Sequence, residues 1–184
     1  MKVVSLESGP RRDAWLARLC AAAHGTQAGL APLVVFSGTR HLLFPGEAAR
    51  LWALQDGRGE PLALALLVLD ESGDGMAVTL AAALGESREP LRRLLHDLAL
   101  KAPLCVSPSE ALDEAFLREC GITRWVENDR GERVGLACQH PAALSGRLTP
   151  PLAFDEQAVL RRFKQERDFF EAEKQAFVDG LGTG

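Results

Sequence analysis

The residues with the clearest potential for chemistry lie in one stretch, Met76 to Ala102. The apolar run Met76–Leu84 predicts a strand, Gly85-Glu86 predicts a tight turn, and a helix is expected to open at Ser87. A helix that directly follows a strand aims free N–H groups and the positive end of its dipole at one point. Such a point can bind a phosphate group, although most strand-turn-helix units serve only as scaffold.

Three arginines, Arg88, Arg92 and Arg93, place positive charge beside this turn. Each one alone is read more simply as a solvated residue on the helix surface. The helix itself is supported by an amphipathic stripe of leucines at i, i+3, i+4 and i+7 spacing. These are Leu91, Leu94, Leu95 and Leu98.

Metal chemistry is not indicated, because the four cysteines and four histidines are scattered without ligand spacing. The cysteines lie among apolar neighbours and are expected to be small core residues. Three carboxylates expected near a ligand cleft could act as a general base, but each is usually a solvated loop residue. The candidates are Glu47, Asp70 and Glu71.

The composition bounds the class of protein. The chain has 184 residues, 47% of them hydrophobic and 25% charged, with a net charge of -4. This balance is typical of a soluble globular domain. The net negative charge does not indicate binding to nucleic acid or to an anionic membrane. No apolar run reaches the roughly 20 residues that span a bilayer, and the N-terminus lacks a signal-peptide pattern, so we expect no membrane association and a cytoplasmic location.

The elements around the central stretch alternate between strands and helices. Before it, we expect a first strand at Lys2–Glu7, a helix from Pro10 to Gly25, and a hairpin of Leu51–Gln55 with Leu62–Asp70. After it, we expect a strand at Leu104–Val106, a helix from Ser107, and a hairpin of Ile122–Glu127 with Arg133–Cys138. The apolar residues of the helix from Ser107 are Leu112, Ala115, Phe116 and Cys120. The segment from Thr26 to Ala49 is expected to be a loop with short ordered pieces. The continuous apolar character of Leu62–Asp70 and Met76–Leu84 predicts central strands that are covered on both faces.

A last helix is expected from Asp155, with Phe163, Phe170 and Phe177 repeating every seven residues. This narrow stripe can pack on its own domain or can meet a second copy in a homodimer, and the sequence favours neither. The domain boundaries follow: 1–140 form the main domain, 141–154 a connector, and 155–184 the C-terminal helix and tail.

The element order from Lys2 to about Cys138 resembles that of the GNAT (N-acetyltransferase) superfamily. The resemblance implies an α/β (α+β) fold with a mixed, mainly antiparallel sheet flanked by helices. It also implies that the fourth strand, Met76–Leu84, splays from the fifth, Leu104–Val106, and that acyl-CoA binds in the opening.

Site residues follow from the same resemblance. The backbone groups of Leu80, Ala82 and Leu84 would pair with pantetheine. The pyrophosphate would lie at the helix start, near Ser87, Arg88 and Arg92. The acceptor amine remains unspecified, and no metal is implied.

The motifs depart from the family pattern. The family's phosphate loop reads Arg/Gln-x-x-Gly-x-Gly/Ala, and the matching positions here are Glu86, Glu89 and Leu91. Glu89 brings a side chain and a negative charge where glycine lets a phosphate approach closely. The tyrosine that commonly protonates the leaving thiolate is replaced by Leu117, and the chain contains no tyrosine. Ser109 or Cys120 could substitute for it.

Two functions remain open. The chain could be an acyl-CoA-dependent N-acyltransferase that works mainly by positioning an amine and an acyl-CoA. Alternatively, it could be a non-catalytic GNAT-like module that binds a ligand or a partner.

Overall fold

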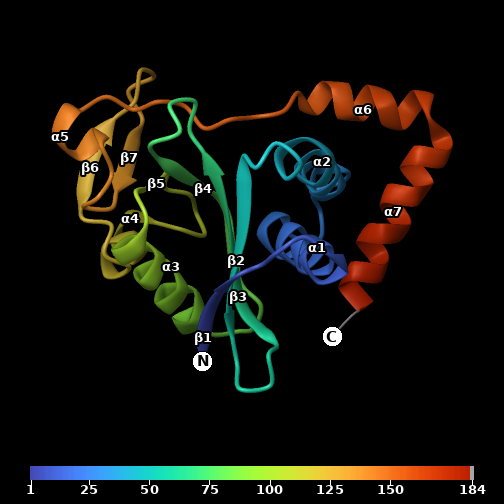
Figure 1. Ribbon diagram of the computed structural model, residues 1–184, viewed down its shortest axis with the longest axis horizontal. Helices are drawn as coiled ribbons and strands as arrows, with labels where there is room; N and C mark the ends of the chain where they lie inside the picture. Colours follow the sequence, from blue (N-terminus) through green and yellow to red (C-terminus); the bar gives the residue numbers. More distant parts are fainter. Residues whose placement is uncertain (183–184) are drawn as a thin grey trace.

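A single seven-stranded sheet organises the chain, as a computed structural model of residues 1–182 describes it (Figure 1). The strands are β1 Lys2–Ser5, β2 Ala49–Gln55, β3 Pro61–Leu69, β4 Met76–Ala83, β5 Leu104–Val106, β6 Arg124–Glu127 and β7 Arg133–Leu136. Their order is β1-β2-β3-β4-β5-β7-β6, and β4 with β5 is the parallel pair. The predicted mixed, mainly antiparallel sheet is confirmed.

Helices cover both faces of this sheet. They are α1 Pro10–His24, α2 Ala31–Gly38, the π-helix η1 Thr39–Leu43, α3 Glu89–Lys101, α4 Glu114–Glu119, α5 Ala142–Ser145, α6 Glu156–Gln165 and α7 Arg167–Gly182. Figure 1 shows α3 and α4 on one side of the sheet and α1, α2, α6 and α7 on the other. None of the helices within residues 1–182 has the length and apolarity needed to cross a membrane.

The central strands are buried from both sides, as the sequence predicted. Leu64, Leu66 and Val68 of β3 pack into the core beneath α1, whereas Ala65 and Leu67 pack into the core beneath α3. Alternate residues of a strand point to opposite faces, so this double burial follows from the unbroken apolar run.

The expected loop from Thr26 to Ala49 is wrong, because this segment contains α2 and η1. Leu33, Val34 and Phe36 are buried against the neighbouring helices, and this packing stabilises a helix that turn residues seemed to interrupt. Gly38 lies inside the helical segment because the Phe154 ring occupies the space of a Cβ at that position. Tertiary packing thus overrides local propensity here.

The helix expected from Ser107 begins later, at Glu114. The carboxylate of Asp113 accepts a hydrogen bond from the Phe116 N–H at 2.9 Å and caps the helix there. Ser109 instead closes a turn, with its Oγ accepting the Leu112 N–H at 3.1 Å. The later start also turns Ala115 outward and Leu117 into the core.

The C-terminal helix predicted from Asp155 is interrupted. Glu166 leaves helical geometry, with φ -118° and ψ 84°, and separates α6 from α7. Phe163 is buried, and the Phe177 ring lies 5.3 Å from that of Phe36 in an edge-on contact. The phenylalanine stripe therefore packs on α2 of its own chain. Assembly into a homodimer through this helix stays a prediction.

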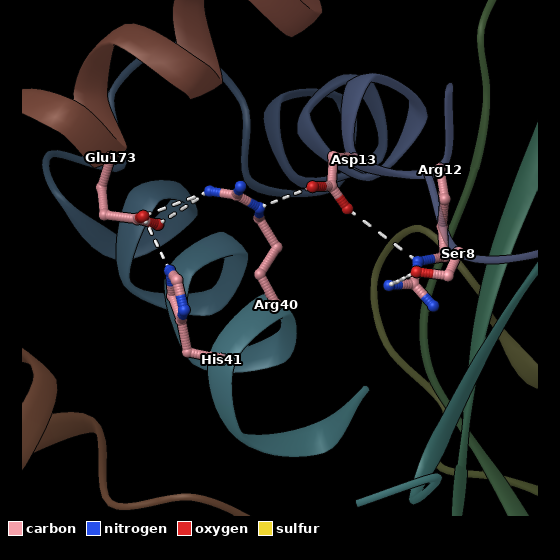
Figure 2. A network of polar contacts seen from close by, with 6 residues as sticks. All are labelled: Ser8, Arg12, Asp13, Arg40, His41 and Glu173. Atoms are coloured by element: carbon pink, nitrogen blue, oxygen red, sulfur yellow. Dashed lines mark hydrogen bonds and ion pairs between the residues drawn. The ribbon is translucent and has the colours of Figure 1, made fainter. Parts of the chain in front are cut away.

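A polar network fastens α7 to the same helices (Figure 2). Arg40 Nη1 donates to both carboxylate oxygens of Glu173 at 3.2 Å, and Arg40 Nε donates to Asp13 at 3.0 Å. His41 Nε2 lies 2.7 Å from Glu173 Oε1. One buried carboxylate on α7 is thus held by two successive residues of η1.

Candidate functional site

An opening forms where β4 and β5 separate. The two strands pair through Met76 with Leu104 and through Ala77 with Cys105, and β4 then continues beyond β5 to Ala83. The β3–β4 register shifts between Leu66 and Leu67, which leaves Thr79 as an extra residue on β4. Such a bulge bends and twists a strand, and it lies where the two strands diverge.

This opening holds a cleft of about 490 Å³, which we call the β4–β5 cleft. Its lining comes from β4, the end of α1, the start of α3 and the loop that follows β5. The residues are Ala22, Ala23, Thr79, Leu80, Ala81, Ala82, Ala83, Gly85, Arg88, Leu91, Ser109, Glu110, Ala111 and Leu112. Leu80, Ala82 and Arg88 from the sequence-based site are among them, whereas Leu84, Ser87 and Arg92 lie outside this lining.

The backbone groups that face the opening differ by one residue from those expected. The Leu84 N–H donates to the Leu62 carbonyl of β3 at 2.9 Å. Because hydrogen-bonding direction alternates along a strand, Leu80 and Ala82 also turn their backbone groups toward β3. Ala81 and Ala83 therefore present their N–H and C=O groups to the cleft.

The helix beside the cleft starts at Glu89, two residues later than Ser87. Ser87 Oγ accepts the Glu89 N–H at 3.2 Å, and Pro90 supplies no donor. Of the backbone N–H groups with which a helix start could bind an anion, that of Glu89 is therefore already bonded, and Pro90 has none.

The two predicted arginines have different surroundings. Arg88 Nη2 donates to the Ala111 carbonyl at 2.6 Å, and its guanidinium lies 4.0 Å from the centre of the Phe116 ring. Arg88 thereby links the start of α3 to the loop across the cleft. Arg92 Nε donates to Glu89 at 2.7 Å, and this hydrogen bond lowers the pKa of the Glu89 carboxyl. The charge of Arg92 is thus balanced by its neighbour.

A second pocket of about 680 Å³ opens beside the first. It is lined by Ala77, Val78, Thr79, Cys105, Ser107, Ser109, Leu112, Asn128, Asp129, Arg130, Val134, Leu148, Thr149, Pro150 and Pro151. Thr79, Ser109 and Leu112 line both spaces, so the two pockets adjoin at the point where the strands separate. Sequence reasoning missed Thr79, although a single threonine in an apolar strand was a visible signal.

Burial distinguishes the residues that could protonate the leaving thiolate. Leu117 and Cys120 are buried in the core, and burial raises the pKa of the Cys120 thiol to about 11. Burial and the charge of Asp70 likewise raise the pKa of Cys105 to about 11, which keeps this pocket-lining thiol protonated at neutral pH. Ser109 is the candidate that lines both pockets.

The candidate carboxylates of the sequence lie elsewhere. Asp70 is buried in the β3–β4 turn, where it accepts from Ser72 Oγ at 2.6 Å and from the Gly73 N–H at 2.8 Å. Glu47 and Glu71 do not line either pocket as described. The described lining carboxylates are Glu110 in the cleft and Asp129 in the second pocket. Within residues 1–182, no cluster of three His, Cys, Asp or Glu side chains could hold a metal ion.

Comparison with one solved structure supports the same architecture, and two others superpose less well. An aminoglycoside 6'-acetyltransferase type Ii superposes with a TM-score of 0.50 at 13% identity, covering 74% of this chain and 94% of its own. A spermidine N-acetyltransferase SpeG chimera from Vibrio cholerae and hSSAT gives 0.49 at 13% identity, covering 73% and 92%. A GNAT-family acetyltransferase from Staphylococcus aureus Mu50 gives 0.49 at 7% identity, covering 73% and 96%. No family model and no curated protein matches the sequence.

Proposed function

We propose that this chain, which has the GNAT fold, is an acyl-CoA-dependent N-acyltransferase that acts on an amine. The observation that carries the proposal is the separation of β4 from β5 after Ala77. It leaves the backbone groups of Ala81 and Ala83 along a cleft that is open to a ligand. A free strand edge of this kind binds extended amide-containing groups by adding hydrogen bonds in strand geometry.

Acyl-CoA supplies the acyl group as a thioester, and this chain's residues position it. The pantetheine amides would pair with Ala81 and Ala83, which brings the thioester toward Thr79 and Ser109, where the two pockets adjoin. An amine in the second pocket would then attack the thioester carbon. The new C–N bond forms, the C–S bond breaks, and the amine loses one proton while the departing thiolate gains one.

Positioning supplies most of the expected rate enhancement, because a held amine and thioester react as if within one molecule. Ser109 can assist the leaving thiolate. Its Oγ accepts the Leu112 N–H at 3.1 Å, so its own O–H is a donor that can be directed into the cleft. This hydroxyl takes the place of the tyrosine that the sequence lacks.

Arg88 is the basic residue among the described lining of the cleft, and it would meet the pyrophosphate. Its charge is partly shared with Asp113, 3.8 Å away. Glu89 opposes an anion nearby. We therefore expect acyl-CoA to bind more weakly than at a glycine-rich phosphate loop.

A non-catalytic GNAT-like module is the second candidate. It is favoured by the Glu89–Arg92 pair, which neutralises a cation beside the cleft, and by the buried Leu117 at the position of the usual acid. The two candidates differ in one measurable property, because the enzyme requires acyl-CoA binding.

Calorimetric titration with acetyl-CoA tests the proposal. The wild-type chain should bind at millimolar or lower concentration. Thr79→Trp should weaken binding by at least about tenfold, because the exposed Thr79 lies where the pockets adjoin and a large ring there blocks the thioester. Thr123→Trp, at another exposed threonine, is the matched control and should bind normally. If the wild-type chain does not bind acetyl-CoA, the non-catalytic function stands.

A further inference from the structure

We propose that the second pocket binds the acceptor, and that this acceptor is a monoamine with an apolar body rather than a polycation. The inference rests on the proposed function and adds a substrate class to it. It is drawn from the lining of the pocket, its charge balance and the way its outer wall is held.

The described lining of the second pocket combines an apolar part with hydroxyl residues, two of which are shared with the β4–β5 cleft. Its apolar members are Ala77, Val78, Cys105, Leu112, Val134, Leu148, Pro150 and Pro151. Thr79 and Ser109 are hydroxyl residues shared with the β4–β5 cleft, whereas Ser107 and Thr149 line the second pocket alone. An acceptor with one polar end and one apolar end can therefore direct its amine to the hydroxyl groups and bury its remainder against the apolar wall.

The charge of the pocket is balanced. Asp129 and Arg130 are successive residues of the β6–β7 turn, and both line the pocket. A ligand that carries several positive charges needs several unpaired carboxylates, since each buried charge must be compensated. One carboxylate beside one guanidinium does not provide this. The described lining thus favours an amine with a single charge.

The outer wall of the pocket is held on the sheet by backbone hydrogen bonds. The chain from 148 to 151 lies along the end of β3, where the Glu71 N–H donates to the Pro150 carbonyl at 3.0 Å and the Leu152 N–H donates to the Leu69 carbonyl at 2.8 Å. Asp70 also forms an isolated β-bridge with Pro151. Proline has no N–H, and the Pro150 carbonyl is already bonded, so apart from Thr149 this wall offers apolar surface to a ligand.

Leu148 gives the wall its contact with the sheet. It packs on the small core cluster that contains Ala77, Cys105 and Val134, all of which line the pocket. A charge introduced at Leu148 would therefore enter the apolar part of the pocket. Leu144 lies in α5, shortly before this wall, but is 93% exposed and outside the described lining, which makes it a matched control.

The experiment compares 2-phenylethylamine with spermidine as acceptors, with acetyl-CoA as donor and release of free thiol as the readout. At about 0.15 M salt, where long-range attraction is screened, 2-phenylethylamine should have a kcat/KM at least about tenfold higher than spermidine. Leu148→Asp should lower the value for 2-phenylethylamine by about tenfold and reduce the preference over spermidine. Leu144→Asp should change neither value.

Binding of each amine is also measured by ligand-observed NMR without acetyl-CoA, so that the pocket is tested even if no turnover occurs. Binding of 2-phenylethylamine that is lost in Leu148→Asp and kept in Leu144→Asp supports the inference. Preference for spermidine, or failure of 2-phenylethylamine to bind, overturns it. Failure of acetyl-CoA to bind overturns the proposed function instead, and the two failures are thereby distinguished.

Discussion

Two regions of the molecule pair glutamate with arginine, and they use the pair differently. At the interface of α7 with η1, Glu173 is 4% exposed and is held by Arg40 and His41 (Figure 2). At the start of α3, Glu89 and Arg92 form an exposed pair one turn apart. A buried pair must be complete to be tolerated, whereas an exposed pair contributes little to stability. The first therefore fixes a helix, and the second adjusts the charge beside a cleft.

Removing Glu173 should have the largest effect. Glu173→Ala removes the buried carboxylate that Arg40 and His41 share, while Arg40 keeps its ion pair with Asp13. We therefore expect the loss of the charged hydrogen bonds to lower the free energy of unfolding by about 2 kcal/mol. Denaturant unfolding followed by circular dichroism measures this. Glu171→Ala, at an exposed position of α7, should change the free energy by less than about 0.5 kcal/mol. Equal effects of the two variants would remove the distinction between the regions.

His140 is a buried polar side chain that, unlike the two pairs, has no ion-pair partner described. It is 3% exposed, its Nδ1 accepts the Ala142 N–H at 3.1 Å, and burial lowers its pKa although Asp70 opposes the shift. The unfolded chain, in which a histidine has a pKa of about 6.5, then binds a proton more readily than the folded chain. The stabilisation is present above about pH 6.5 and is lost as the pH falls below it.

Thermal unfolding between about pH 7.5 and pH 5 measures this dependence. His140→Asn, which keeps an acceptor for Ala142, should flatten the decline in melting temperature. His24→Asn, the same substitution at the end of α1 and outside the core, is the comparison variant. A wild-type melting temperature that does not fall with pH would contradict the expectation.

The smallest expected effect is at the exposed pair. Glu89→Gln removes a negative charge beside the cleft and releases Arg92, so acetyl-CoA should bind about two- to fivefold more tightly with little change in stability. Glu114→Gln is the control, because Glu114 of α4 also pairs with arginines, Arg118 and Arg133, outside the described lining of the cleft. Titration calorimetry compares the two variants. A similar gain in both would indicate a general effect of net charge.

The sequence predicted the parts of the fold that depend on local periodicity. β3, β4, β5 and the leucine stripe of α3 lie where the apolar runs indicated, because a buried strand or helix face leaves its own pattern. The helical nature of Ala31–Leu43 was missed, since it depends on packing by distant residues such as Phe154 and Phe177. A seven-residue spacing of phenylalanines likewise gave no sign of the break at Glu166.

The sequence predicted where the candidate site lies, but not which backbone groups and side chains face it. The opening beside β4 followed from the resemblance of element order. The direction of each backbone group could not be read, because the bulge at Thr79 changes the alternation and depends on pairing with β3. The contribution of residues 148–151 to the second pocket was also beyond sequence reasoning. It arises from hydrogen bonds to β3 across some eighty residues of chain.

The course of the chain after α5 has a consequence for folding. The segment that closes the second pocket connects α5 to α6 on the opposite face of the sheet (Figure 1). Its contacts join residues far apart in sequence, such as Leu152 with Leu69, and contacts of this kind form slowly. During synthesis the strands, the last of which ends at Leu136, are complete before residues 148–152 leave the ribosome. The second pocket is therefore among the last parts of the molecule to be completed, and a nascent chain carries it without its outer wall.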